Sequence, residues 1–394
     1  MLISTKIANI TPSATLAISA KAKAMTADGI DVINFGVGEP DFDTPENIRK
    51  AGIKAIKNGM TRYTPASGTT ELKAAIADKL KRENGLEYSP KEIVISSGAK
   101  HTLYNLMQVM TNPGDEVLLP APYWVSYYEQ IGLAGGRAVI IECSEKNKFK
   151  MTPDALEAAI TPRTKYLILN SPSNPTGAVY TRDELQELAK VLARHEVWVI
   201  ADEIYEKLIY DKERHVSIAS LSDRMKKLTI VVNGVSKTFA MTGWRIGYAA
   251  GDERAIAACG SLQSHSTSNP CSISMAASVE ALQGGLDAVT QMRNEFDKRR
   301  KYMLGRLSGI KGVACAEPKG AFYAFPNIKG VKGRTFGGVT ADTSVALCGA
   351  LLEQAHVAAV PGSAFGADDH IRFSYATSME NIQEGMNRFE KFLS

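Results

Sequence analysis

The segment Asn233–Gly247 carries the residues with the clearest potential for chemistry. Lys237 lies there among small and apolar residues, shortly after the apolar run Leu228–Val232, which has the composition of a buried strand. Desolvation lowers the pKa of a lysine and frees its amine to attack a carbonyl carbon. Eight residues further on, Arg245 offers a planar fork of N–H donors that suits a phosphate or a carboxylate. The segment therefore predicts a nucleophilic amine beside an anion site.

A turn of small residues, Ser96–Lys100, follows the apolar run Ile93–Ile95 and opens the helical segment His101–Met110. Backbone N–H groups at such a helix start can hold a phosphate, and Gly98 permits close approach. Turns of this kind also occur simply because they save space. On these residues alone the turn is a candidate phosphate cradle, and both interpretations stay open.

Three other apolar runs also end in polar or planar groups, Trp124, Asn174 and Asp202. Trp124 is either a core residue or a platform for a planar ring. Asn174 presents an amide between prolines, which turn chemistry also explains. Asp202 is either half of a structural ion pair or the counter-ion of a cationic ligand, because a buried carboxylate requires a cation or a proton.

Taken together, these groups match the needs of one cofactor, pyridoxal phosphate. It requires a lysine for its aldehyde, an anion that keeps its ring nitrogen protonated, donors for its 3-oxygen, a stacking partner and a phosphate site. Lys237 and Asp202 supply the first two, and Tyr205 adds a phenol close to Asp202. The ends of the apolar runs therefore predict a pyridoxal-phosphate site.

Six apolar runs explain how these distant groups come together. Continuous apolar runs indicate strands buried on both faces, and helical segments between them indicate parallel crossovers. In open α/β sheets, ligands bind beyond the carboxyl ends of the strands. The predicted fold is therefore an α/β three-layer sandwich around a mostly parallel sheet. The runs are Ile93–Ile95, Val117–Leu119, Val139–Ile141, Tyr166–Leu169, Val197–Ile200 and Leu228–Val232.

The pattern changes near residue 290, where a long charged helix precedes shorter strand candidates and a closing helix. This indicates a second, smaller α+β domain. The strand candidates are Ala321–Phe325, Val357–Val360 and Ile371–Tyr375. The predicted organisation is an N-terminal arm over residues 1–30 that forms part of the small domain, a large cofactor-binding domain over 31–285 and a C-terminal small domain over 286–394.

Composition narrows the possible partners. The chain has 394 residues, 44% hydrophobic and 22% charged, which suits a globular protein of two or three packed units. Its net charge is +4, with basic residues scattered along the chain, so no nucleic acid is expected. Five widely spaced cysteines without a C-x-x-C pair favour reduced thiols over disulfides or a metal site. With neither a signal peptide pattern nor an apolar stretch of about 20 residues, we expect a cytoplasmic protein without a membrane partner.

The stretch Gly234–Gly247 closely resembles the pyridoxal-phosphate attachment signature of class I aminotransferases. The resemblance covers essentially the whole chain, and it implies fold type I, a homodimer with sites at the subunit boundary, and the aspartate aminotransferase branch found in bacteria and archaea. The other matching segments are GEPDFDTP (38–45), RYTPASGTTELKAAI (62–76), PYW (122–124), NSPSNPTG (170–177) and ADEIYEKL (201–208).

The resemblance also implies residue roles. Lys237 would bond the cofactor aldehyde and shuttle a proton, Asp202 would hold the ring nitrogen, and Tyr205 completes the catalytic set. The implied cofactor-binding residues are Gly98, Ala99, Lys100, Trp124, Asn174, Asp202, Tyr205, Ser236, Lys237, Arg245 and, from the other subunit, Tyr63. The implied substrate-binding residues are Gly38, Lys100, Trp124, Asn174 and Arg372. Gly234 departs from the family, because many relatives carry a phosphate-binding serine there.

The implied reaction is ping-pong transfer of the amino group from L-aspartate to 2-oxoglutarate, so the partners are amino acids and 2-oxo acids. Lys100 would pair with the distal carboxylate, helped by Ser13 and Thr15, or would only screen the cofactor phosphate. Thr11 stands where prephenate-accepting relatives carry a basic residue, which favours aspartate. The alternatives are a glutamate/aspartate-prephenate or broader aromatic aminotransferase and a pyridoxal-phosphate-dependent β-lyase. A transcription regulator on this fold would need a DNA-binding domain, which residues 1–30 do not supply.

Overall fold

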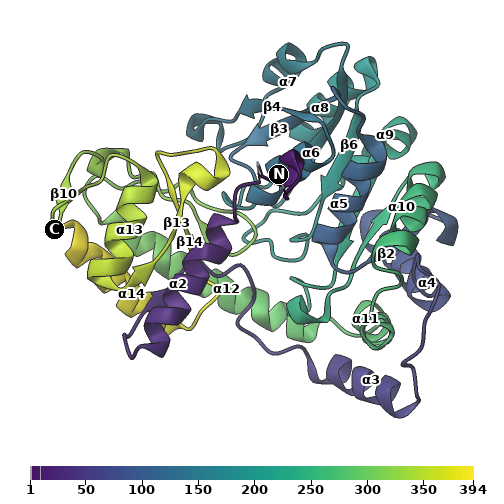
Figure 1. The fold of residues 1–394 in the computed structure, drawn as a ribbon, viewed down its shortest axis with the longest axis horizontal. Coiled ribbons are helices and arrows are strands. Elements are labelled where there is room, and N and C mark those ends of the chain that lie inside the picture. The colour runs from purple at the N-terminus through teal and green to yellow at the C-terminus, as the bar shows by residue number, and fades with distance from the viewer. Residues whose placement is uncertain (1, 9) are drawn as a thin grey trace.

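Seven strands form one sheet at the centre of the larger of two packed regions (Figure 1). The structure, a computed structural model, describes residues 2–8 and 10–394. The strands lie in the order β2-β8-β7-β6-β5-β3-β4; neighbours from β7 to β4 run parallel, whereas β8 is antiparallel to β2 and β7. They are β2 (Ile93–Ser96), β3 (Glu116–Ala121), β4 (Arg137–Glu142), β5 (Thr164–Asn170), β6 (Trp198–Asp202), β7 (Thr229–Gly234) and β8 (Gly247–Ala250).

The predicted mostly parallel sheet is confirmed, since each of the six apolar runs overlaps one strand, with only Val197 and Leu228 lying one residue before theirs. The runs do not include β8, whose sequence GYAA has little of the β-branched character that marks a strand.

Both faces of the sheet are buried, as the continuous apolar runs predict. Along β3, Val117 and Leu119 pack into one core, whereas Leu118 between them packs into another. Helices α5, α6 and α10 contribute to the first core, and α7, α8 and α9 to the second, which makes the predicted three layers. A further core joins the edge strand β2 and its neighbour β8 to α3, α4 and α11. These helices are α3 (Glu46–Lys57), α4 (Thr70–Lys79), α5 (Ala99–Met110), α6 (Val125–Leu133), α7 (Pro153–Ala159), α8 (Arg182–His195), α9 (Asp223–Leu228), α10 (Glu253–Ser266) and α11 (Ser272–Gln283).

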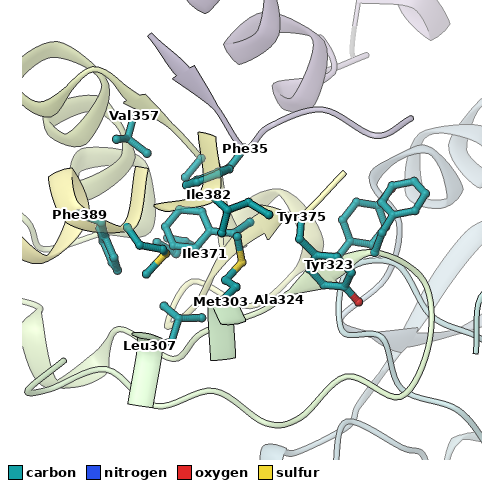
Figure 2. Close-up of a cluster of buried hydrophobic side chains, with 14 of the residues drawn as sticks. Phe35, Met303, Leu307, Tyr323, Ala324, Val357, Ile371, Tyr375, Ile382 and Phe389 are labelled. Atoms are coloured by element: carbon teal, nitrogen blue, oxygen red, sulfur yellow. The ribbon is translucent and has the colours of Figure 1, made fainter. Parts of the chain in front are cut away.

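The smaller region gathers the two ends of the chain around the long helix α12 (Figure 1). Strand β1 pairs with β12, and β13, β14 and β9 form an antiparallel sheet. Figure 2 shows its core, where Phe35 from the N-terminal part lies beside Ile371 and Ile382 from the C-terminal part. The chain begins with the short helix α1 (Thr5–Ala8), and the elements of the smaller region are α2 (Ala14–Ala27), β1 (Ile33–Asn34), α12 (Asp287–Ser308), β9 (Tyr323–Ala324), β10 (Thr335–Phe336), β11 (Val339–Thr340), α13 (Ser344–Ala355), β12 (Val357–Ala358), β13 (Val360–Pro361), β14 (Ile371–Ser374) and α14 (Met379–Leu393).

The strand predicted over Val357–Val360 is wrong as a single strand. The structure has two short strands there, and β12 pairs with β1 whereas β13 pairs with β14. The partner β1 comes from the other end of the chain, so packing between distant segments decides this boundary. No helix in the described part of the chain has the length and apolar composition to cross a membrane.

Candidate active site

A cavity of about 410 Å³ lies at the carboxyl ends of β5, β6 and β7, where side chains from both regions meet. It is bounded by most of the residues that the sequence singles out. Of the predicted site residues, the cavity is lined by Gly38, Ala99, Lys100, Trp124, Asn174, Asp202, Tyr205, Ser236, Lys237, Arg245 and Arg372.

Lys237 lies in the turn after β7, and its Nζ donates a hydrogen bond to the carbonyl of Gly38 at 2.5 Å. Burial lowers the pKa of Lys237 to about 8; the nearby carboxylate of Glu39 opposes this shift, and the cations Arg245 and Arg372 add to it. An amine with this pKa is partly unprotonated near neutral pH, so it can act as a nucleophile.

Asp202 ends β6 and is 3% exposed. Its carboxylate accepts a hydrogen bond from the hydroxyl of Tyr127 at 2.6 Å and one from the backbone N–H of Ile204 at 3.2 Å. Burial nevertheless raises the pKa of Asp202 to about 6. Among the described residues, no lysine or arginine lies within ion-pair distance of this carboxylate. The geometry therefore does not support the structural ion pair and favours the counter-ion of a cationic ligand.

Arg372, on β14, is 1% exposed and has two hydrogen-bond partners. Its Nη1 donates to Asn174 Oδ1 at 3.0 Å and its Nη2 to the carbonyl of Gly36 at 2.9 Å. The Nε is buried and has no acceptor among the described residues, and the guanidinium lies 4.3 Å from the ring centre of Tyr323. A buried guanidinium without a carboxylate partner is prepared to bind an anion.

The start of α5 and the turn at Arg245 meet very closely. Gly98, which precedes α5, has a φ of 91°, and a Cβ there would lie 2.3 Å from Nη2 of Arg245. Gly98 forms no side-chain cap, so among the described residues no side chain covers the first N–H groups of α5 from that position. The arrangement is compatible with the predicted cradle, whose binding of an anion stays a prediction. Gly98 itself is not part of the cavity lining given above.

Gly234 has no room for the serine found in many relatives. A Cβ at this position would lie 2.8 Å from the carbonyl oxygen of Ile246 and 3.1 Å from Cα of Gly247. Contacts this short require the backbone to move, so the anion site of this chain is built without that hydroxyl.

Trp124 and Lys100 flank the cavity together. Trp124 precedes α6 and is partly exposed at the cavity wall, and it packs edge-on against Tyr127 at 5.3 Å. The Nζ of Lys100 lies 4.9 Å from the ring centre of Trp124. Partial burial and the charge of Arg245 lower the pKa of Lys100. Trp124 thus packs at the edge of the core and also lines the cavity, and its stacking on a planar ring stays a prediction.

The sequence interpretation missed two tyrosines that act on predicted residues. Tyr127 donates to Asp202, and the hydroxyls of Tyr323 and Tyr205 lie 2.8 Å apart. Tyr127 follows Trp124 by one helical turn, a spacing that places both side chains on one face of α6 and was available as a signal. Tyr323 lies in a short strand far along the chain and gave no such signal.

Tyr63 lies apart from this cavity. Its side chain is 90% exposed, and it is not part of the described cavity lining. Its contact with the phosphate of another subunit stays a prediction.

Glu203, Glu206 and His215, which follow the strand that carries Asp202, form one group of possible metal ligands among the described residues. The ammonium of Lys79 contacts Glu206, and Nε2 of His215 lies 2.9 Å from Glu203. Since the protein already places a cation there, the cluster is internally neutralised.

Comparisons with known proteins identify the family to which this chain belongs. The sequence model of the family Aminotransferase class I and II matches residues 30–389, and the chain belongs to this family. It is therefore a transaminase with the fold type I architecture. The aspartate aminotransferase of Geobacillus stearothermophilus is 51% identical to it over 393 residues, covering 100% of this chain and 99% of the relative.

Two further proteins extend this comparison. An aspartate/prephenate aminotransferase of Cereibacter sphaeroides is 48% identical over 392 residues, which cover 99% of this chain and 98% of the relative. The structure of aspartate aminotransferase from Thermus thermophilus with maleate superposes with a TM-score of 0.94 at 41% identity, covering 100% of both chains.

Proposed function

We propose that this transaminase uses pyridoxal 5′-phosphate to transfer the amino group of L-aspartate to 2-oxoglutarate, giving oxaloacetate and L-glutamate. The observation that carries the proposal is a pair of cations, Arg372 and Lys100, that line the same cavity as the nucleophilic Lys237. Within the described chain, neither cation has a carboxylate within ion-pair distance. Aspartate and 2-oxoglutarate each carry two carboxylates, which such a cavity would match.

The residues present fit pyridoxal phosphate. Asp202 is a buried carboxylate in need of a cation, and the pyridinium nitrogen of the cofactor would provide one. The cradle of Ala99, Ser236 and Arg245 would hold the phosphate, and Trp124 would stack on the ring. When bound, the cofactor supplies an aldehyde for the amino group and a ring that withdraws electrons from the substrate Cα.

Lys237, Asp202 and Tyr205 would each have a separate role in the reaction. Lys237 would take the proton from the substrate Cα and hold it for return, since its pKa of about 8 permits both protonation states near neutral pH. Asp202 would keep the ring nitrogen protonated, and Tyr127 and Ile204 orient its carboxylate. Tyr205 would donate to the 3-oxygen.

Asn174 would also bind the 3-oxygen, and Arg372 would bind the α-carboxylate of the substrate in a fork. Gly38 would cover the substrate, because its carbonyl already lies against Lys237. Lys100 would pair with the distal carboxylate, helped by Ser13 and Thr15, which also line the cavity.

The relatives support the choice of substrate. The Geobacillus relative is named an aspartate aminotransferase, and the Thermus structure contains maleate, a four-carbon dicarboxylate. A second candidate, aspartate/prephenate transamination, is favoured by the name of the Cereibacter relative and by the apolar side chains Leu16 and Leu103 in the cavity wall.

Steady-state rates with one acceptor, 2-oxoglutarate, would separate these candidates. We expect kcat/KM for aspartate to exceed that for phenylalanine by at least about tenfold, because phenylalanine leaves Lys100 unpaired. The reverse reaction with prephenate as acceptor is expected to be slow. A preference for phenylalanine or prephenate would overturn the choice of aspartate.

We further propose a cytoplasmic homodimer with the organisation given above: an arm over 1–30, a large domain over 31–285 and a small domain over 286–394. An exposed apolar face on and beside α3, made by Ile53, Ile56 and Met60, supports the dimer. Tyr63 lies next to this face and would reach the phosphate of the partner subunit. All five cysteines are free, which fits a reducing compartment. Sedimentation at increasing concentration tests the dimer, and a monomer that is fully active would contradict it.

A further inference from the structure

Residues Gly36–Phe42 form a segment over the candidate active site, here called the covering segment. Two of its backbone carbonyls accept hydrogen bonds from cations of the cavity. The carbonyl of Gly36 accepts from Nη2 of Arg372 at 2.9 Å, and that of Gly38 accepts from Nζ of Lys237 at 2.5 Å. The position of the covering segment therefore influences where both cations point.

Asp41 ties the covering segment to helix α12. Both carboxylate oxygens of Asp41 accept from Nη1 of Arg299, at 2.8 and 2.9 Å, although the two residues are 258 positions apart in the chain. Helix α12 belongs to the smaller region, whereas Lys237 follows a strand of the larger sheet (Figure 1). The ion pair thus fixes the covering segment to the smaller region, across the site from Lys237.

The surroundings of Arg299 hold its guanidinium in one orientation. The side chain is 8% exposed, and the guanidinium lies 5.2 Å from the ring centre of Phe42 and 5.8 Å from that of Phe296. These rings pack edge to face at 5.4 Å, and Nε of Arg299 donates to Glu295 at 3.2 Å. The guanidinium is thus fixed between two rings and two carboxylates, whereas Asp41 keeps 27% of its side chain exposed, so the pair is shielded from water on the arginine side.

The covering segment also has a contact with the larger region. The hydroxyl of Thr242 donates to the carboxylate of Glu39 at 2.7 Å. Glu39 and Asp41 therefore hold the segment from two sides, with Gly38 directly beside Glu39. Of these two contacts, the one from Asp41 is the better shielded from solvent.

We propose that Asp41 and Arg299 are positioning residues for transamination, whose ion pair holds the carbonyl of Gly38 over Lys237 and thereby sets the affinity for substrate. Neither residue is among the described residues that line the cavity, so both act through the covering segment. The effect on substrate rests on the function proposed above, whereas the anchoring of the segment can be measured without any substrate.

The test compares Asp41→Asn with the matched control Asp43→Asn in the cofactor-loaded protein. Both variants remove one negative charge from nearby positions, but Asp43 is 90% exposed and lies 3.9 Å from its partner Arg49. For D41N we expect the rate of amide hydrogen exchange in residues 36–42 and the KM for the amino donor each to rise about tenfold. This is the size of effect that the loss of one charged hydrogen bond produces. Cofactor affinity should change less than about twofold. D43N should change none of these.

The variant Arg299→Met and the double variant complete the test. If the ion pair acts as one unit, D41N/R299M should show nearly the same exchange and KM as D41N alone. Should R299M fail to fold, Arg299→Lys keeps the charge and is expected to give an intermediate exchange rate. Unchanged exchange in D41N, or equal effects of D41N and D43N, would overturn the proposal. If the unmodified protein shows no transaminase activity, the proposed function is refuted, but the exchange result still tests whether Asp41 anchors the covering segment.

Discussion

Replacing Asp202 by asparagine should stabilise the cofactor-free protein while it damages the active site. The carboxylate is buried without a cationic side chain within ion-pair distance in the described chain, so its ionisation in the native state is unfavourable. An asparagine of the same size can accept from the N–H of Ile204 and donate to the hydroxyl of Tyr127, which keeps both contacts.

The magnitude follows from the pKa. Burial raises the pKa of Asp202 from its ordinary value of 3.8 to about 6, and at about 1.36 kcal/mol per pKa unit this corresponds to roughly 3 kcal/mol. Well below pH 3.8 the side chain is protonated in the folded and unfolded states, and the two proteins should be about equally stable. As the pH rises toward 6, the unfolded chain ionises first, so the unmodified protein loses stability relative to the variant.

Urea unfolding of the cofactor-free proteins between pH 4 and pH 8 measures this difference. We expect Asp202→Asn to be more stable by about 3 kcal/mol at pH 8, with the difference shrinking toward zero near pH 4. The exposed substitution Asp43→Asn is the control and should show no such pH dependence. A difference independent of pH, or a variant less stable than the unmodified protein at pH 8, would refute the reasoning. The same variant should lose most of its transaminase activity, since an amide cannot hold the ring nitrogen as a cation.

Three other substitutions test individual residues. Lys237→Ala should abolish amino transfer while leaving the circular dichroism spectrum unchanged, and residual turnover would contradict its role. Glu39→Gln removes the carboxylate that raises the pKa of Lys237, so the pH midpoint for bonding pyridoxal phosphate in stopped-flow absorbance should move below about 8; an unmoved midpoint would count against this electrostatic contact. Arg372→Lys replaces the fork by a point charge and should raise KM for aspartate roughly 10- to 100-fold with a smaller effect on kcat. An unchanged KM would place the α-carboxylate elsewhere.

The position of the site could be predicted because strands buried on both faces have continuous apolar runs. The residues after these runs, Asp202 and Lys237 among them, then fall at one edge of the sheet by topology alone. A search for continuous apolar runs does not find β8, because the small residues of this strand are equally common in loops.

Contacts between distant segments could not be predicted. Tyr323 touches Tyr205 across 118 positions, and Arg299 touches Asp41 across 258. Such partners depend on how the two regions pack, and a local pattern of residues contains no information about that packing. The sequence therefore indicates the groups that act directly on a ligand better than the groups that hold them in place.

We propose that this chain transfers an amino group through its cofactor in two half-reactions, with aspartate as the donor. The most direct test mixes the cofactor-loaded protein with L-aspartate in the absence of an oxo-acid acceptor and measures oxaloacetate against the number of active sites. We expect about one oxaloacetate per site and then no further product until 2-oxoglutarate is added. Continued turnover with release of ammonia would indicate a lyase, and no oxaloacetate at all would contradict the assignment of aspartate.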